Sequence, residues 1–181
     1  MIITKSSNLQ QDELYGEAAN TYGPALDRLA KAYEADPDRR RDLLQEIHVA
    51  LWRSLGNFDQ RCSLRTWVYR VAHNVAASHI IRDHRIYSHE LVSLEAADSK
   101  TASEPDPVER IDENRALEWL TRMIRQLKPL DRQVMLLYLE GLDAAAIGEI
   151  SGISARNVAT KIHRIKTILA HRFQERSLHH E

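Results

Sequence analysis

The sequence predicts an all-α protein with two small helical domains joined by a flexible acidic linker, of which the C-terminal domain is a helix-turn-helix. Hydrophobic residues make up 43% of the 181 residues, against only six glycines and five prolines, as is typical of a folded, helix-rich chain. Apolar residues recur every three or four positions in both halves. Residues 88–110 lack this period and are rich in Asp, Glu, Ser and Pro. The expected domains are therefore residues 10–87 and 111–176.

The composition narrows the classes of function. A net charge of −1 means that any affinity for nucleic acid must come from basic residues segregated on one surface. The single cysteine, Cys62, leaves no internal disulfide and fits a reducing compartment. No segment has the apolar length of a signal peptide or of a membrane span, which predicts a cytoplasmic protein that does not insert into membranes.

Two helices are expected at the N-terminal end of the chain. Leu14 and Ala18 share one face of a first helix, which should end at Gly23. Pro24 is then favoured in the first turn of a second helix, because an N–H group in that turn has no helical partner to lose. The sequence around Pro37 should end this second helix.

A third helix is expected over residues 42–55. Leu43, Ile47, Leu51 and Leu55 repeat every four residues there and should face the core. The opposite side of this helix is left without a core partner. It carries Asp42, Gln45, Glu46, Val49 and Arg53.

A fourth helix is expected from Ser63, its N-cap, to about Arg85, after a polar loop. Its core face should comprise Leu64, Trp67 or Val68, Val71 and Val75. The side chains expected to point away from the core are Arg70, His73, Asn74 and Ala77. Arginines interleaved with aromatic residues suit single-stranded nucleic acid, because cations follow the phosphates and rings accept unstacked bases. Core packing explains Trp67 more readily than base stacking does, but it explains Phe58 and Arg61 in the loop less well.

The C-terminal half carries a basic second helix behind a tight turn. Asp143 can cap a short helix, Gly152 lies in the turn, and Ser154 can cap the next helix. The buried stripe of that helix should comprise Val158, Ile162, Ile165 and Leu169. From Ser154 to Gln174 it has no carboxylate, whereas a surface helix normally mixes both signs of charge, and it lacks the Trp or several Phe of a membrane-binding helix. The pattern indicates a helix-turn-helix that places its second helix in the major groove of DNA.

These motifs together resemble the extracytoplasmic-function (ECF, group IV) bacterial sigma factors of the sigma-70 family. The N-terminal half supplies DLLQE, LWRSLGNF and SLRTWVYRVAHN, which begin at Asp42, Leu51 and Ser63. The C-terminal half supplies LKPLDRQVM and IGEISGISARNV, which begin at Leu127 and Ile147. The similarity covers about residues 14–85 and 115–173, which is nearly everything except the linker and the tails.

The resemblance implies a protein that binds core RNA polymerase, directs it to a promoter and helps to open the duplex, with no catalytic residue, cofactor or metal of its own. The residues implied to dock on polymerase are Asp42, Gln45, Glu46 and Arg53. Those implied to read the minus-ten element as a single strand, with one base extruded, are Phe58, Arg61, Ser63, Arg65, Arg70 and Asn74. An anti-sigma factor is a further implied partner, and we expect a monomer when the protein is free.

The resemblance also implies that the C-terminal basic helix reads the minus-thirty-five element in the major groove. The residues expected nearest the bases are Arg156, Asn157, Thr160 and Lys161, and those nearer the phosphates are His163, Arg164 and Lys166. Arg156 and Asn157 stand where small residues are common in the family, which predicts an unusual upstream element. Ala159 stands where Lys is frequent, and His48 replaces a frequent aromatic residue of the docking helix.

The sequence alone is compatible with two other classes of function. A stand-alone helix-turn-helix regulator accounts for the C-terminal half but leaves residues 14–85 unexplained, and it predicts tight duplex binding without polymerase. A metalloenzyme or metal sensor could draw on the nine histidines. However, His73, His79 and His84 do not share a helical face, and the sole cysteine has no partner in a metal-binding motif.

Overall fold

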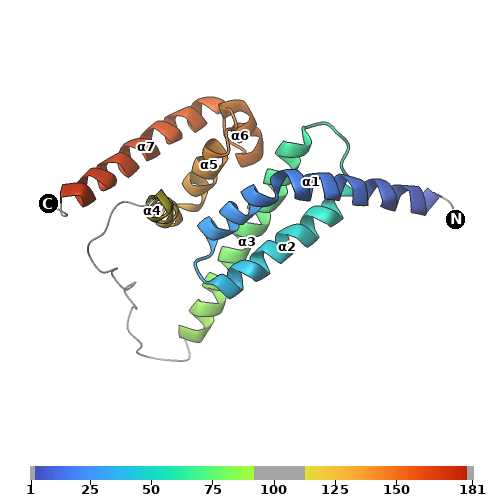
Figure 1. The fold of residues 1–181 in the computed structure, drawn as a ribbon, viewed down its shortest axis with the longest axis horizontal. Helices are drawn as coiled ribbons and strands as arrows, with labels where there is room; N and C mark the ends of the chain where they lie inside the picture. The colour runs from blue at the N-terminus through green and yellow to red at the C-terminus, as the bar shows by residue number, and fades with distance from the viewer. Residues whose placement is uncertain (1–2, 92–112, 179–181) are drawn as a thin grey trace.

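The computed structural model describes residues 3–91 and 113–178, with the side chains of residues 9–82 and 116–173 (Figure 1). Over these residues the chain is helical, with seven α-helices and no strand, which confirms the all-α prediction. The helices are α1 (Ile3–Tyr33), α2 (Pro37–Leu55), α3 (Leu64–Leu91), α4 (Glu113–Arg125), α5 (Pro129–Leu139), α6 (Ala144–Ser151) and α7 (Ala155–Leu178).

Helices α1, α2 and α3 form an N-terminal bundle around one apolar core. The four leucine and isoleucine residues predicted to face inward on α2 are all buried, which confirms that face: Leu43, Ile47, Leu51 and Leu55. Helix α2 begins earlier than expected, at Pro37. Asp36 caps it, because its Oδ1 accepts the N–H groups of Asp38 at 2.9 Å and Arg39 at 3.0 Å. Proline fits at this first position, where its missing N–H has no partner.

The predicted break at Gly23 and Pro24 is wrong, since α1 runs unbroken through both residues. An interior proline weakens a helix by about 3 kcal/mol, because it removes one hydrogen bond and crowds the preceding turn. Here the helix is held on both sides of that point. Ala18 before it and Leu26 after it are both fully buried in the same bundle core. Tertiary burial therefore overrides the local signal.

Helix α3 differs from the prediction in its inner face and in its length. His73, expected to point outward, is only 2% exposed, and its Nδ1 lies 3.0 Å from the hydroxyl of Tyr33. The buried side of the helix is centred on Val68, Ala72 and Ala76 rather than on Val71 and Val75. The helix continues to Leu91, past the expected end and into the predicted linker, because no glycine or proline interrupts it. Residues 92–112 lie outside the description, so the rest of the linker stays a prediction.

Helices α5, α6 and α7 form the predicted helix-turn-helix. The carboxylate of Asp143 caps α6 by accepting the N–H of Ala146 at 2.8 Å, and Ser154 Oγ caps α7 by accepting the N–H of Asn157 at 3.3 Å. Gly152 ends α6 in the left-handed region, with φ of 76°. A Cβ atom on Gly148 would lie 2.7 Å from the backbone oxygen of Ile153, so α6 approaches the turn more closely than any other residue type allows.

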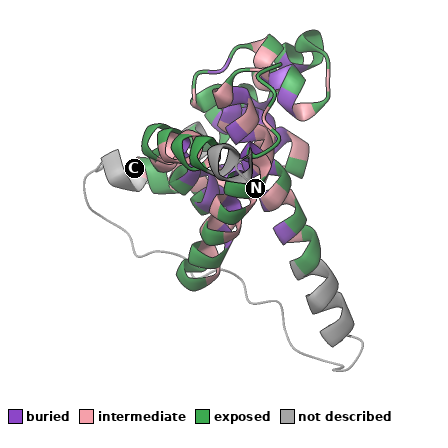
Figure 2. Cartoon of the chain, turned by 90° about the vertical axis from the view of Figure 1, so that its right-hand side faces the viewer, coloured by how far each residue is buried: buried purple, intermediate pink, exposed green. Residues whose placement is uncertain are grey.

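The two halves pack against each other. Buried residues gather in the middle of the molecule, where the helices cross (Figure 2). Ala25 of α1 and Tyr69 of α3 belong to the core of the helix-turn-helix, and Ala32 of α1 packs with Ile124 of α4 and Met135 of α5. The apolar core is therefore continuous between the N-terminal bundle and the C-terminal helices.

No described helix is both long and apolar enough to cross a membrane. Nor do the described side chains include a group of three His, Cys, Asp or Glu residues placed to hold a metal ion.

Candidate nucleic-acid interface

The exposed side of α7 carries four polar side chains near its N-terminal end. We call Arg156, Asn157, Thr160 and His163 the recognition face. They are exposed because the helix buries Val158 and Ile165 on its other side. The Thr160 hydroxyl donates to the backbone oxygen of Arg156 at 3.0 Å, whereas no such bond ties the Arg156 guanidinium to another described residue. This face carries no negative charge, so it can approach phosphates. Its hydrogen-bond donors and acceptors can pair with base edges.

Two further predicted residues of α7 are held by a carboxylate that the sequence analysis missed. Asp131 of α5 accepts from Lys161 Nζ and from the Arg164 guanidinium, both at 2.6 Å. The Asp131 side chain is only 9% exposed, and that of Lys161 is 26% exposed. These charge-assisted bonds fix α7 against α5. No local pattern could have revealed them, because the partners come from separate helices.

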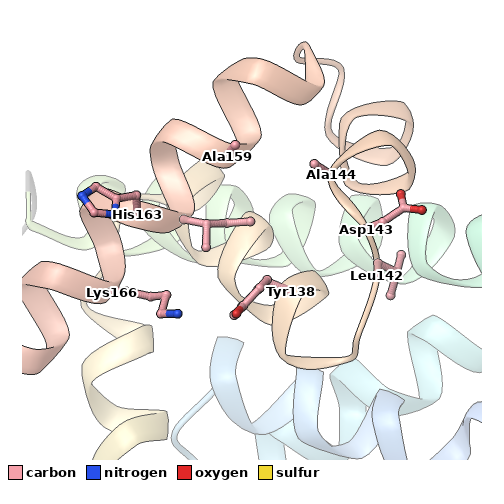
Figure 3. Close-up of a pocket in the computed structure, with 8 residues that line it drawn as sticks. Tyr138, Leu142, Asp143, Ala144, Ala159, His163 and Lys166 are labelled. Atoms are coloured by element: carbon pink, nitrogen blue, oxygen red, sulfur yellow. The ribbon is translucent and has the colours of Figure 1, made fainter.

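Lys166, the remaining predicted cation, borders a shallow hollow between α7 and the start of α6 (Figure 3). The hollow has a volume of about 360 Å³ and a largely apolar floor that includes Leu142, Ala159 and Ile162. Lys166 Nζ points toward the Tyr138 ring and lies 5.6 Å from its centroid. His163 of the recognition face also lines the hollow, so the hollow adjoins that face.

The loop before α3 holds three of the predicted minus-ten residues in different ways. Phe58 is half-buried with its ring centroid 5.3 Å from that of Trp67, so it anchors the loop to the bundle. Ser63 Oγ accepts the N–H of Thr66 at 3.1 Å and caps α3. Arg61 is exposed, and its Nε lies 3.0 Å from the carboxylate of Asp59. Of these three side chains, Arg61 is the one placed for an outside ligand.

The three predicted minus-ten residues on α3 itself also differ in their surroundings. Asn74 is exposed. Arg70 forms an ion pair with Glu149 of α6, at 2.8 Å, and Arg65 donates to the backbone oxygen of Glu140 at the end of α5. Two arginines of the predicted single-strand site are therefore bonded to the helix-turn-helix.

The predicted polymerase-docking residues lie together on α2. Asp42, Gln45 and Arg53 are exposed, and Glu46 is half-exposed and bonded to Arg82 of α3. The same side of the helix carries two apolar side chains, Val49 at 42% and Trp52 at 40% exposure. Trp52 was missed as part of this surface, although its spacing from Gln45 and Val49 places it there. Its indole N–H donates to Asp12 of α1 at 2.8 Å, which fixes the orientation of the ring.

Glu140 accepts several of the polar bonds between the two halves. The Arg28 guanidinium holds its carboxylate with two bonds of 2.8 Å, and the Tyr69 hydroxyl donates to it at 3.2 Å. Burial, with the nearby Glu140 charge, raises the pKa of Tyr69 to about 12. The phenol therefore stays protonated and keeps its donor at neutral pH.

Comparison with known proteins matches both halves of the chain in order. Residues 18–86 match the sigma-70 region 2 family, and residues 117–169 match the sigma-70 region 4 family. The stand-alone regulator leaves the first of these matches unexplained, and it is not favoured.

Similar proteins cover most of the chain. The RNA polymerase sigma factor CnrH of Cupriavidus metallidurans is 24% identical over 86% of this chain and 84% of its own. YlaC of Bacillus subtilis is 28% identical over 70% of this chain and 72% of its own, and the ECF sigma factor SigW of Bacillus subtilis is 26% identical over 84% of each.

Two solved structures share the fold. CnrH in complex with the cytosolic domain of CnrY superimposes with a TM-score of 0.64 at 18% identity, over 96% of each chain. The sigma factor RpoE of Bartonella quintana, in complex with the anti-sigma factor NepR, gives a TM-score of 0.68 at 17% identity, over 88% of this chain and 96% of that one. Together with the two family matches, these likenesses establish that the chain belongs to the extracytoplasmic-function group of the sigma-70 family, the factors that direct RNA polymerase to promoters.

Proposed function

We propose that the two halves divide promoter recognition between them. Residues 10–87 bind core polymerase through α2 and read the minus-ten element through the loop before α3 and α3 itself. Residues 111–176 read the minus-thirty-five element through α7. The polymerase performs the chemistry, and the protein acts in the cytoplasm beside it. One observation carries this proposal: the same chain exposes two surfaces. The docking side of α2 comes first along the chain, and the recognition face of the helix-turn-helix comes second.

For the upstream element, we assign base contacts to Arg156, Asn157 and Thr160. Arginine pairs well with guanine and asparagine with adenine, and each good bidentate pair discriminates by about 1–3 kcal/mol. His163 and Lys166 lie further along α7 and suit phosphates. Lys161 and Arg164 add positive charge near the duplex but act first by holding α7 to Asp131.

For the minus-ten element, we assign strand contacts to Arg61, Arg65, Arg70 and Asn74. Phe58 and Ser63 shape the loop from beneath, because one packs on Trp67 and the other caps α3. Extruding one base costs a few kcal/mol, which contacts with the strand and with polymerase must offset.

We also propose that an anti-sigma factor binds this chain. Both solved relatives are held in complex with a regulator, CnrH with the cytosolic domain of CnrY and RpoE with the anti-sigma factor NepR. Such a partner would cover the surfaces that polymerase and promoter use, and the protein released from it would be a monomer.

The test of the proposed function is co-elution of the purified chain with bacterial core RNA polymerase. Gln45→Ala with Glu46→Ala should weaken the complex roughly tenfold or more, because both side chains lie on the docking side of α2. The matched control, Gln10→Ala with Glu13→Ala, changes the same residue types at exposed positions of α1. Equal loss in both variants, or no complex with the wild type and tight duplex binding alone, would overturn the proposal.

A further inference from the structure

Two ring side chains that lie one turn apart on α2 are both contacted by α1. The indole N–H of Trp52 donates to the carboxylate of Asp12 at 2.8 Å. The Nδ1 atom of His48 lies 3.1 Å from the hydroxyl of Tyr15, and the two rings meet edge to face with their centroids 6.0 Å apart. Residue numbers rise along α2 while they fall along α1, so the two helices run antiparallel at this contact (Figure 1). The early turns of α1 therefore lie along α2 beside its docking side.

The backbone of Trp52 is also held by α1. Gly56, four residues further on, donates its N–H to the backbone oxygen of Ser54 and thus leaves the Trp52 carbonyl without a helical partner. Carbonyl groups in the last turn of a helix take partners from outside the helix. Gln11 is that partner, because its Nε2 donates to the backbone oxygen of Trp52 at 2.6 Å. The backbone and the ring of Trp52 are therefore fixed by adjacent residues of α1.

The bond to Asp12 acts mainly on the orientation of the Trp52 ring. Helices α1 and α2 already share an apolar core, in which Leu26, Leu43 and Leu51 are fully buried. One hydrogen bond between partly exposed groups adds little to burial of that extent. The Asp12 side chain is exposed, and Trp52 is 40% exposed. The bond thus selects one orientation for a large ring that reaches solvent.

Trp52 lies on the side of α2 to which we assign polymerase. Val49 and Trp52 follow Gln45 by four and seven residues, which places all three on one side of the helix. Tryptophan is among the residues that contribute most to contacts between proteins, because its rigid ring covers a large apolar area. A ring that is already oriented loses less conformational freedom when a partner binds. The docking side therefore has an apolar centre that is prepared for contact.

We propose that Asp12 is a positioning residue for the binding of core RNA polymerase and that it acts through Trp52. This inference rests on the proposed function, because it takes α2 as the helix that docks. The Asp12 carboxylate accepts the indole N–H and holds the ring in the orientation that polymerase meets. The early turns of α1 thereby belong to the docking unit, although Asp12 itself makes no contact with polymerase.

The experiment measures the affinity of the fluorescein-labelled full-length chain for bacterial core RNA polymerase. Trp52→Ala removes the ring and should weaken binding roughly tenfold or more. Asp12→Ala removes the acceptor and should weaken binding roughly three- to tenfold, because the ring must then be ordered during binding. Asp12→Asn keeps an oxygen that accepts the indole N–H, so its affinity should stay within about twofold of the wild type.

The matched control is Glu13→Ala, which removes a carboxylate from the next, exposed position of α1 and should leave the affinity unchanged. The double variant Asp12→Ala, Trp52→Ala separates positioning from direct contact. If Asp12 acts only through Trp52, the double variant binds no more weakly than Trp52→Ala alone. A further loss in the double variant would overturn the inference. Equal losses in Asp12→Ala and either Glu13→Ala or Asp12→Asn would overturn it too.

The bond itself is tested on the free chain by nuclear magnetic resonance. The chain has three tryptophans, and each gives one indole N–H signal in ¹⁵N-labelled protein. The signal of Trp52 is identified by its loss in Trp52→Ala, and it should shift in Asp12→Ala. Trp119 of α4 packs against Phe173, so its signal is the internal reference. A Trp52 signal that does not move in Asp12→Ala would overturn the inference.

The same variants distinguish failure of this inference from failure of the proposed function. If neither Trp52→Ala nor Gln45→Ala with Glu46→Ala weakens the complex, α2 does not dock on polymerase and the proposed function is wrong at that point. If the substitutions at Gln45 and Glu46 weaken the complex while Asp12→Ala does not, the docking side is right and the positioning role of Asp12 is wrong.

Discussion

Asp131 determines which cations of α7 remain available for DNA. It holds Lys161 and Arg164, whereas Arg156 stands free of it on the recognition face. We expect Arg156→Ala to weaken binding to the preferred upstream element by about 1–3 kcal/mol and to relax the preference at one base position. Lys161→Ala should instead lower the free energy of unfolding, because it leaves a buried carboxylate with one partner fewer.

The measurement is binding of both variants, within the polymerase complex, to a library of upstream sequences, together with urea unfolding of each free protein. Lys166→Ala is the control for a phosphate contact and should weaken binding evenly across the library. A uniform loss with Arg156→Ala, or an unaltered stability with Lys161→Ala, would contradict these assignments.

His73 makes the stability of the fold depend on pH. Burial lowers its pKa to about 3, while a histidine in the unfolded chain titrates near 6.5. Between these values the unfolded chain binds a proton that the folded chain does not, so stability falls as the pH decreases. This single group should lower the free energy of unfolding by about 2 kcal/mol from pH 7 to pH 5.

Urea unfolding at the two pH values checks this expectation. His73→Gln keeps a hydrogen-bonding side chain opposite Tyr33 without a titrating group, and it should remove about that much of the pH dependence. His163→Gln, at an exposed position of α7, is the matched control. A pH dependence that survives His73→Gln would show that other groups carry it.

At the scale of single residues, the sequence could place the recognition face but not its partners. Helical periodicity alone puts Arg156 and Thr160 opposite the buried Val158 and Ile165. It contains no information about Asp131 or Glu140, because each meets its cations across separate helices. For the same reason, α3 was predicted with His73 outward, since a period centred on Val71 ignores the polar partner that Tyr33 supplies.

At the scale of the helix, local sequence signals predicted the ends that are capped. They failed where packing in the core determines whether a helix continues. Asp143, Gly152 and Ser154 mark the ends of α6 and α7 as predicted, because caps act within a few residues. Gly23 and Pro24 carry equally strong signals, yet α1 continues through them with buried residues on both sides. Tertiary packing of that kind cannot be derived from a window of neighbouring residues.

Two glycine positions within helices should respond in opposite ways to the same substitution. A Cβ atom at Gly23 would meet no atom within 4 Å, so Gly23→Ala should stabilise α1 by about 0.5–1 kcal/mol. A Cβ atom at Gly148 would lie 2.7 Å from the backbone oxygen of Ile153, so Gly148→Ala must displace α6 from the turn. We expect a loss of about 1–3 kcal/mol there, as in other overpacked sites.

Thermal unfolding of the two alanine variants, followed by circular dichroism, measures both effects. Because α6 supports the start of α7, Gly148→Ala should also weaken binding to the upstream element, while Gly23→Ala should leave it unchanged. Equal melting temperatures for the two variants would show that the turn after α6 yields more easily than its geometry indicates.

At the scale of the whole molecule, the chain has the two domains of its family, but these domains share part of one apolar core. Tyr69 belongs to the N-terminal bundle by sequence, but its ring is buried with Val134 and Leu137 of the helix-turn-helix. Its centroid lies 6.1 Å from that of Tyr22, and its hydroxyl donates to Glu140. One side chain thus couples the packing of the two halves and the ionic contact that closes them.

We therefore expect the free wild type to unfold in a single calorimetric transition, because neither half buries its apolar surface fully without the other. Tyr69→Ala removes the shared ring and should split the trace into two transitions, with a total loss of about 3–5 kcal/mol in the free energy of unfolding.

Tyr69→Phe is the matched control, since it keeps the ring and loses only the bond to Glu140. It should keep one transition, with a loss of about 1 kcal/mol in the free energy of unfolding. Two transitions already present in the wild type would mean that the halves fold independently.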